Sequence, residues 1–186
     1  GEAGVASVAA EEGLGDIAVA GLTATAERVR LVDFVTDEKK RVSEVVVTGP
    51  GAPRLDTVED LSGHRVLVRR SSSYHDSLVA LSARLKSSGR REITLVPADE
   101  NLQIEDILEL VRSGVEPITV ADDYLGHFWA GVMGQLFVRD DLVVREPRLF
   151  GPAIRKDSPR LAAALHAFQN SHGVGTLFGN VVVKRY

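Results

Sequence analysis

The chain has 186 residues, of which 44% are hydrophobic and 26% are charged, as in an ordinary globular protein. Its formal net charge of -4 does not favour nucleic-acid binding, which requires a basic surface stripe. The sequence contains no cysteine, which excludes disulfides, thiolate catalysis and cysteine-based metal sites. This composition is compatible with a cytosolic or a periplasmic protein.

The first residues of the chain do not follow the pattern of a signal peptide, because they lack a basic start and an apolar centre. They instead resemble the end of a helix, so we expect the chain to be part of a longer protein. No segment approaches the ~20 consecutive apolar residues of a membrane-spanning helix.

Strands alternate with helices along the chain from residue 15 to the end. Apolar runs predict strands over residues 16–22, 41–49, 64–70, 92–97, 117–123 and 134–141. Capping residues and apolar periodicity predict helices over residues 2–12, 57–63, 73–89, 104–114 and 159–171. This alternation predicts an α/β protein with doubly wound, mainly parallel sheets.

Ligands of doubly wound sheets bind at the carboxyl ends of strands, beside helix N-termini. The turn "GLTATAER" follows the first predicted strand and offers the hydroxyl of Thr23 and the guanidinium of Arg28. An arginine presents a planar fork of donors that suits a carboxylate. Alternatively, Arg28 pairs with Glu27 or Asp33 on the surface.

Two further strand ends carry candidate binding residues. In "RRSSSY", Ser72 and Ser73 lie at a predicted helix start, where free backbone N–H groups favour an anion. In "VADD", Asp122 and Asp123 end a strand and can accept hydrogen bonds from an ammonium group. Each has a structural alternative, because serine and aspartate are also common helix caps. Together with Arg28, these residues describe a receptor for a zwitterion.

Other site chemistries lack their sequence motifs. The histidines show no H-x-x-x-H or H-E-x-x-H spacing, so we expect no metal ion or other cofactor. The G-x-S-x-G, P-loop and G-x-G-x-x-G motifs of hydrolases and nucleotide-binding proteins are also missing.

The stretch "GDIAVAGLTATAERVRLVDF" resembles the signature of family 3 periplasmic solute-binding proteins. The resemblance continues through "VEDLSGHRVLVRRSSSYHDSL" and "GPAIRKDSPRLAAALHAF" and covers nearly the whole chain. The ending "GTLFGNVVVKRY" resembles the junction in F-type membrane-bound lytic murein transglycosylases, where a solute-binding-like domain precedes a lysozyme-like catalytic domain.

This resemblance implies a periplasmic-binding-protein-like fold of two lobes that close on a ligand. Lobe 1 would comprise residues 1–41 and 146–186, and lobe 2 would comprise residues 42–145. Lobe 1 would be incomplete, because the strand, helix and strand that begin the family's domain are not in this sequence. Lobe 2 is large enough to fold alone.

The resemblance also implies a role for each candidate residue. Arg28 would hold the α-carboxylate of the ligand, with Thr23 and the backbone of Gly21 beside it. Ser73, with Ser72 next to it, would bind the same carboxylate from the other lobe. Asp122 would take the α-ammonium group.

We therefore expect a non-catalytic domain that binds an amino acid or a cell-wall-derived peptide. Its location would be periplasmic or outer-membrane-associated, and its partner a lysozyme-like domain that it regulates. Three alternatives stay open: a stand-alone receptor for an ABC permease, the sensor domain of a signalling protein, and an enzyme. The enzyme would resemble cyclohexadienyl dehydratases, with Asp122, Asp123 or His127 as its general acid or base.

Overall fold

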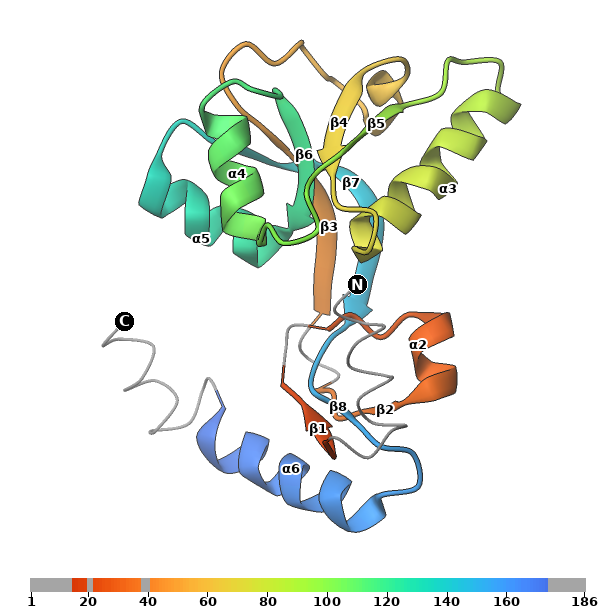
Figure 1. Ribbon diagram of the computed structural model, residues 1–186, viewed down its shortest axis with the longest axis vertical. Coiled ribbons are helices and arrows are strands. Elements are labelled where there is room, and N and C mark those ends of the chain that lie inside the picture. Colours follow the sequence, from red (N-terminus) through yellow and green to blue (C-terminus); the bar gives the residue numbers. More distant parts are fainter. Residues whose placement is uncertain (1–14, 20–21, 38–40, 174–186) are drawn as a thin grey trace. The chain divides into compact units, whose positions relative to one another are not determined.

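The computed structural model describes residues 15–19, 22–37 and 41–173 (Figure 1). The helix expected over residues 2–12 lies outside this part of the chain. The described residues form two compact units. The first unit is the continuous segment Arg41–Arg148, and the second unit combines the segments on either side of it.

The first unit is built on a five-stranded sheet in the order β5-β4-β6-β3-β7. Its strands are β3 (Arg41–Thr48), β4 (Arg65–Val68), β5 (Thr94–Pro97), β6 (Ile118–Asp122) and β7 (Phe137–Leu149). β4 pairs in parallel with both β5 and β6, whereas β6 pairs antiparallel with β3. Pairing is thus parallel across β5-β4-β6, as expected for most of the sheet. The sheet as a whole is mixed, because β3 is antiparallel to β6.

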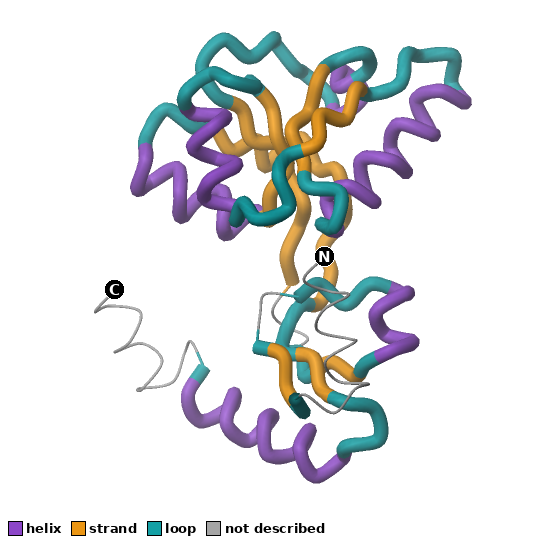
Figure 2. Tube along the Cα trace, in the orientation of Figure 1, coloured by secondary structure: helices purple, strands orange, loops and turns teal. Residues whose placement is uncertain are grey.

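Helices cover both faces of this sheet, with α3 on one side and α4 and α5 on the other (Figures 1 and 2). The helices are α3 (Ser73–Ser87), α4 (Ile104–Arg112) and α5 (Asp123–Met133), and a short 3-10 helix, η1, spans Val58–Leu61. Alternation along the strands divides the core accordingly. Val46 packs in the α3 cluster, and its neighbour Val47 packs in the cluster with α4. The α/β fold class with helices on both faces is confirmed.

The second unit contains a small antiparallel sheet in the order β1-β8-β2. Its strands are β1 (Ile17–Ala18), β2 (Asp33–Phe34) and β8 (Ala153–Ile154), and its helices are α2 (Ala26–Leu31) and α6 (Pro159–His172). The prediction of mainly parallel strands is wrong for this sheet. Because its strands come from both ends of the chain, their direction was not evident from local patterns.

Helix α3 starts at Ser73 as expected, and its N-cap is Ser72, whose hydroxyl accepts a hydrogen bond from the backbone of His75. Two strands differ clearly from the sequence-based expectation. β7 runs to Leu149, beyond the expected end at residue 141, because charged residues interrupt the apolar pattern without ending the strand. In the described residues, β1 covers only Ile17–Ala18 of the strand expected over 16–22.

Candidate functional site

Asp122 occupies the last position of β6, a strand whose residues are all buried. Only 3% of the residue is exposed. It is also the N-cap residue of α5, yet its side chain makes no capping hydrogen bond. Asp123 differs, since its carboxylate accepts hydrogen bonds from the backbone N–H groups of Ser43 and Tyr124. Capping therefore does not account for a buried carboxylate at position 122.

Three side chains from other elements surround Asp122. Glu44 of β3 stands directly opposite it in the antiparallel register and is only 1% exposed. Arg145 of β7 donates from Nη1 to Oε1 of Glu44 at 3.2 Å. The backbone N–H of Asp122 donates to the hydroxyl of Tyr74 in the first turn of α3, at 3.3 Å. We call these four residues, Glu44, Tyr74, Asp122 and Arg145, the acidic cluster.

The acidic cluster leaves two buried oxygen atoms without a hydrogen-bond partner in the described residues: Oε2 of Glu44 and Oδ1 of Asp122. Buried polar atoms are satisfied in the great majority of cases, and an unpaired carboxylate oxygen is costly. These two oxygen atoms are therefore acceptors for a donor that the described part of the protein does not supply.

Burial, followed by repulsion from Glu44 and Asp123, raises the pKa of Asp122 to about 7. Tyr74 and Arg145 oppose this change, but their effect is smaller. Burial and the neighbouring Asp122 also raise the pKa of Tyr74 well above its ordinary value. Asp122 thus changes charge near neutral pH, and a bound cation would favour its ionised form.

The serine-rich turn before α3 lies next to the acidic cluster through Tyr74. Ser72 is engaged within the turn, because its hydroxyl accepts from the backbone N–H of His75 and donates to the carbonyl of Arg69 at 2.8 Å. Ser73 is the first helical residue and is 8% exposed. The first turn of a helix offers backbone N–H donors to an anion. The structure thus brings Ser73 and Asp122 into neighbouring parts of the first unit, and it gives Ser72 the role of a cap.

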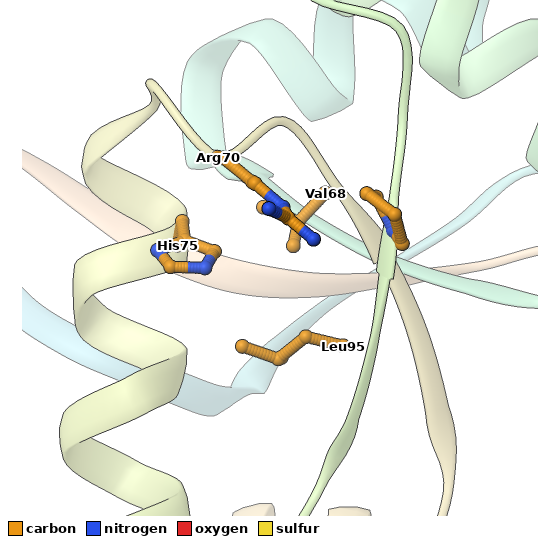
Figure 3. Close-up of a pocket in the computed structure, with 5 residues that line it drawn as sticks. Val68, Arg70, His75 and Leu95 are labelled. Carbon is orange, nitrogen blue, oxygen red and sulfur yellow. The ribbon is translucent and has the colours of Figure 1, made fainter.

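A small pocket lies at the carboxyl ends of β4 and β5, beside the first turn of α3 (Figure 3). Its volume is about 230 Å³, and its lining residues are Val68, Arg70, His75, Leu95 and Pro97. Figure 3 shows the side chain of Arg70 and the ring of His75 around the same space. Neither Ser73 nor Asp122 lines this pocket, so it does not coincide with the predicted binding residues.

In the second unit, Arg28 lies in the short helix α2 and contacts the preceding turn. Its Nη1 donates to the carbonyl of Thr23 at 3.1 Å, and Thr23 is 3% exposed. Thr25 caps the helix by accepting from the backbone N–H of Arg28 at 3.3 Å. Asp33, the suggested surface partner of Arg28, is 2.7 Å from Nζ of Lys156. Gly21, the remaining predicted binding residue, lies outside the described residues.

Sequence reasoning missed Glu44, Tyr74 and Arg145. A signal for Glu44 was present, because it interrupts the valine-rich run of the predicted strand over residues 41–49. An acidic residue in such a run is expected to be either on an exposed face or paired. Tyr74 and Arg145 carried no comparable signal, since their contacts depend on long-range packing.

Within residues 15–19, 22–37 and 41–173, no group of three or more histidine, aspartate or glutamate side chains could hold a metal ion. Among the helices described, none has the length and apolar character needed to cross a membrane.

No model of a known protein family matches the chain. In sequence, it is similar to membrane-bound lytic murein transglycosylase F of Saccharophagus degradans, with 30% identity over 108 residues. The matched region is 58% of this chain and 20% of that relative, so the chain spans about a fifth of the relative's length.

Solved structures of amino-acid-binding proteins share the fold. An ancestral arginine-binding protein bound to arginine has a TM-score of 0.71 and 21% identity, over 96% of this chain and 74% of that protein. The substrate-binding protein of an amino acid ABC transporter has a TM-score of 0.72 and 17% identity, over the same shares of 96% and 74%. A putative ABC transporter binding component from Wolinella succinogenes, complexed with lysine, has a TM-score of 0.71 and 18% identity, over 89% and 67%. The expected resemblance to solute-binding proteins is confirmed, and the fold is that of these binding proteins.

Proposed function

We propose that the chain is a non-catalytic domain that binds an amino acid or a cell-wall-derived peptide through the two charged ends of the ligand. The observation that carries this proposal is the buried Asp122, whose Oδ1 has no hydrogen-bond partner in the described residues. An ammonium group has N–H donors and a positive charge, and it would satisfy this oxygen by a charge-assisted hydrogen bond.

The carboxylate end of the ligand would bind at the start of α3. Ser73 begins this helix, and Tyr74 connects the same turn to the backbone of Asp122. The donors for an anion and the acceptors for a cation therefore lie on neighbouring elements of one unit. In the second unit, we assign Arg28, with Thr23 and Gly21, as a further carboxylate-binding group, since a guanidinium suits a carboxylate.

The solved structures with this fold support an amino-acid ligand. They include proteins described as bound to arginine, to glutamine and to lysine. Their low identity to this chain leaves the ligand's side chain open, and we therefore assign a class of ligand.

The similarity to lytic murein transglycosylase F supports a periplasmic location and a regulatory role. In this proposal, residues 1–41 with 146–186 and residues 42–145 form two lobes, and ligand binding shifts the population of lobe arrangements that an attached catalytic domain senses. A stand-alone receptor for an ABC permease is the second candidate, favoured by the similarity to a transporter's substrate-binding protein. Of the residues named for the enzymatic alternative, His127 is paired with Asp140 on the exposed surface and Asp123 accepts hydrogen bonds from the backbone, which leaves Asp122 as its general acid or base.

Thermal unfolding of the chain with arginine, lysine, glutamine and muropeptides tests the proposed function. A ligand at a hundredfold its dissociation constant adds about 2.7 kcal/mol to the free energy of unfolding. We expect Arg28→Ala and Asp122→Asn to abolish this gain. Arg30→Ala, an exposed position on the same helix as Arg28, is the control and should keep it. Binding that persists in Asp122→Asn would refute the proposed function.

Two assays distinguish a regulatory domain from a transport receptor. If the chain regulates a transglycosylase, the ligand that stabilises the chain should change the rate at which that transglycosylase cleaves peptidoglycan. If the chain is a transport receptor, the same ligand should leave cleavage unchanged, and deletion of the chain should reduce ligand uptake.

A further inference from the structure

Glu44 is a buried acidic residue that has no role in the proposed binding of the ligand's two charged ends. It lies in β3, is 1% exposed, and stands opposite Asp122 in the β3–β6 register. Side chains directly opposite each other in an antiparallel pair have Cβ atoms about 4.5–5.5 Å apart. Like charges at such positions destabilise a sheet, so this arrangement calls for an explanation.

The charges inside the acidic cluster do not balance. Glu44 and Asp122 both carry a negative charge when ionised, and the only cation paired with either in the described residues is Arg145. The hydroxyl of Tyr74 is neutral at physiological pH, since its pKa is raised well above the ordinary value. The cluster is therefore one positive charge short of neutrality.

The unpaired atoms of the cluster point to the same deficit. Arg145 contacts Oε1 of Glu44, which leaves Oε2 without a partner in the described residues. Oδ1 of Asp122 also lacks a partner there. One carboxylate from each of two facing strands thus has a buried, unused acceptor. A single proton, or a single cation with several N–H donors, would satisfy this arrangement.

Four elements contribute groups that bear on the charge of Asp122. α3 contributes Tyr74, α5 contributes Asp123 and Tyr124, β3 contributes Glu44 and β7 contributes Arg145. Among these groups only Arg145 is a cation, and it is paired with Glu44. The described residues place no second cation beside the two carboxylates, so we expect a proton to neutralise the pair when no ligand is bound.

We propose that Glu44 is a second acidic residue of the cation-binding site, that it shares one proton with Asp122 in the ligand-free protein, and that the cationic group of the ligand replaces this proton. The inference rests on the proposed function for the identity of the cation, an ammonium or guanidinium group with at least two N–H donors. On binding, these donors contact Oε2 of Glu44 and Oδ1 of Asp122, and the proton is released to solvent.

The first arm of the test uses the ligand-free chain and therefore does not depend on the proposed function. The carboxyl carbon of Asp122 is followed by NMR during a pH titration of the wild type, Glu44→Gln and Glu116→Gln. Glu116 is a matched control, because it is also a buried glutamate paired with an arginine, Arg65, in the same unit. We expect Glu44→Gln to move the Asp122 midpoint to lower pH and Glu116→Gln to leave it unchanged.

A second variant, at Arg145, keeps the test valid if Glu44→Gln does not fold. Arg145→Gln removes the positive charge next to Glu44 and should move the Asp122 midpoint to higher pH. An Asp122 midpoint that neither variant moves, or that Glu116→Gln moves as much as Glu44→Gln, overturns the inference.

The second arm measures proton release with L-arginine, L-lysine and L-glutamine by calorimetry, in buffers of different ionisation enthalpy. At about pH 6, we expect wild type to release about one proton per bound ligand and to bind about tenfold more weakly than at about pH 8. Glu44→Gln should lose most of both effects. Binding without proton release overturns the inference but keeps the proposed function. If neither these amino acids nor the muropeptides of the thermal unfolding test bind, the proposed function fails, and so does the replacement of the proton by a cation of the ligand.

Discussion

The hydroxyl of Tyr74 lies 3.3 Å from the backbone nitrogen of Asp122 and joins the first turn of α3 to the end of β6. Helix α3 follows β4, whereas β6 is a later strand of the same sheet, and the two residues are 48 positions apart in the sequence. The contact fixes the position of a helix start, which offers N–H donors, relative to a buried carboxylate, which offers acceptors. It is thus the structural link between the two halves of the proposed ligand site in the first unit.

Replacement of Tyr74 with phenylalanine tests this link. The variant loses one partly buried hydrogen bond, and we expect the free energy of unfolding to fall by about 0.5–1.5 kcal/mol in urea titrations. The hydroxyl of Tyr74 also interacts with the Asp122 side chain and favours its ionised form. The midpoint for titration of the Asp122 carboxyl should therefore move to higher pH. An unchanged urea midpoint and an unchanged titration would show that the contact has no energetic role.

Asp122→Asn should change how stability depends on pH. Since the pKa of Asp122 is raised from 3.8 to about 7, the native state retains a proton that the unfolded chain releases at lower pH. The resulting stabilisation is complete below about pH 4 and is lost as the pH rises through about 7. Between about pH 4 and pH 8, the difference in unfolding free energy should move by about 2–4 kcal/mol in favour of the variant.

Asp60→Asn provides a control of opposite sign. Asp60 accepts hydrogen bonds from the backbone N–H groups of Asp56 and Thr57, which lower its pKa. The stabilisation from ionised Asp60 is present at neutral pH and lost as the pH falls. The free energy of unfolding of the variant, relative to wild type, should therefore decrease as the pH rises. Equal pH profiles for both variants would contradict the assignment of Asp122 as a buried, destabilised carboxylate.

Local signals in the sequence were enough to predict much of the first unit. The valine-rich run of β3, the caps of α3 and the apolar periodicity of α4 each depend on neighbours in the chain, which a sequence shows directly. The place of Asp122 at the end of a strand was also predicted, because the strand "ITVAD" is visible in the sequence. The facing residue Glu44 was not, since its position depends on antiparallel pairing with a strand that is distant in the sequence.

The close approach of α4 to the end of β3 gives a prediction that does not depend on function. A Cβ atom at Gly49 would lie 2.1 Å from the carbonyl oxygen of Val111, which is backbone and cannot move aside cheaply. We expect Gly49→Ala to lower the free energy of unfolding by about 1–3 kcal/mol. Gly131→Ala is the matched control, because no atom lies within 4 Å of its added Cβ. In the interior of α5, it should stabilise by about 0.5–1 kcal/mol.

Replacement of Ser72 should affect stability, whereas replacement of Ser73 should affect ligand binding. The hydroxyl of Ser72 is engaged by the backbone of its own turn, so Ser72→Ala should lower the free energy of unfolding by about 0.5–2 kcal/mol. Ser73 is the first helical residue, and its proposed partner is the ligand's carboxylate. Loss of a hydrogen bond to a charged group weakens binding by about 1.5–3 kcal/mol, which is about tenfold or more in the dissociation constant. Urea titrations and calorimetry with the stabilising amino acid measure the two effects. If Ser72→Ala weakened binding more than Ser73→Ala, the assignments of cap and ligand contact would have to be exchanged.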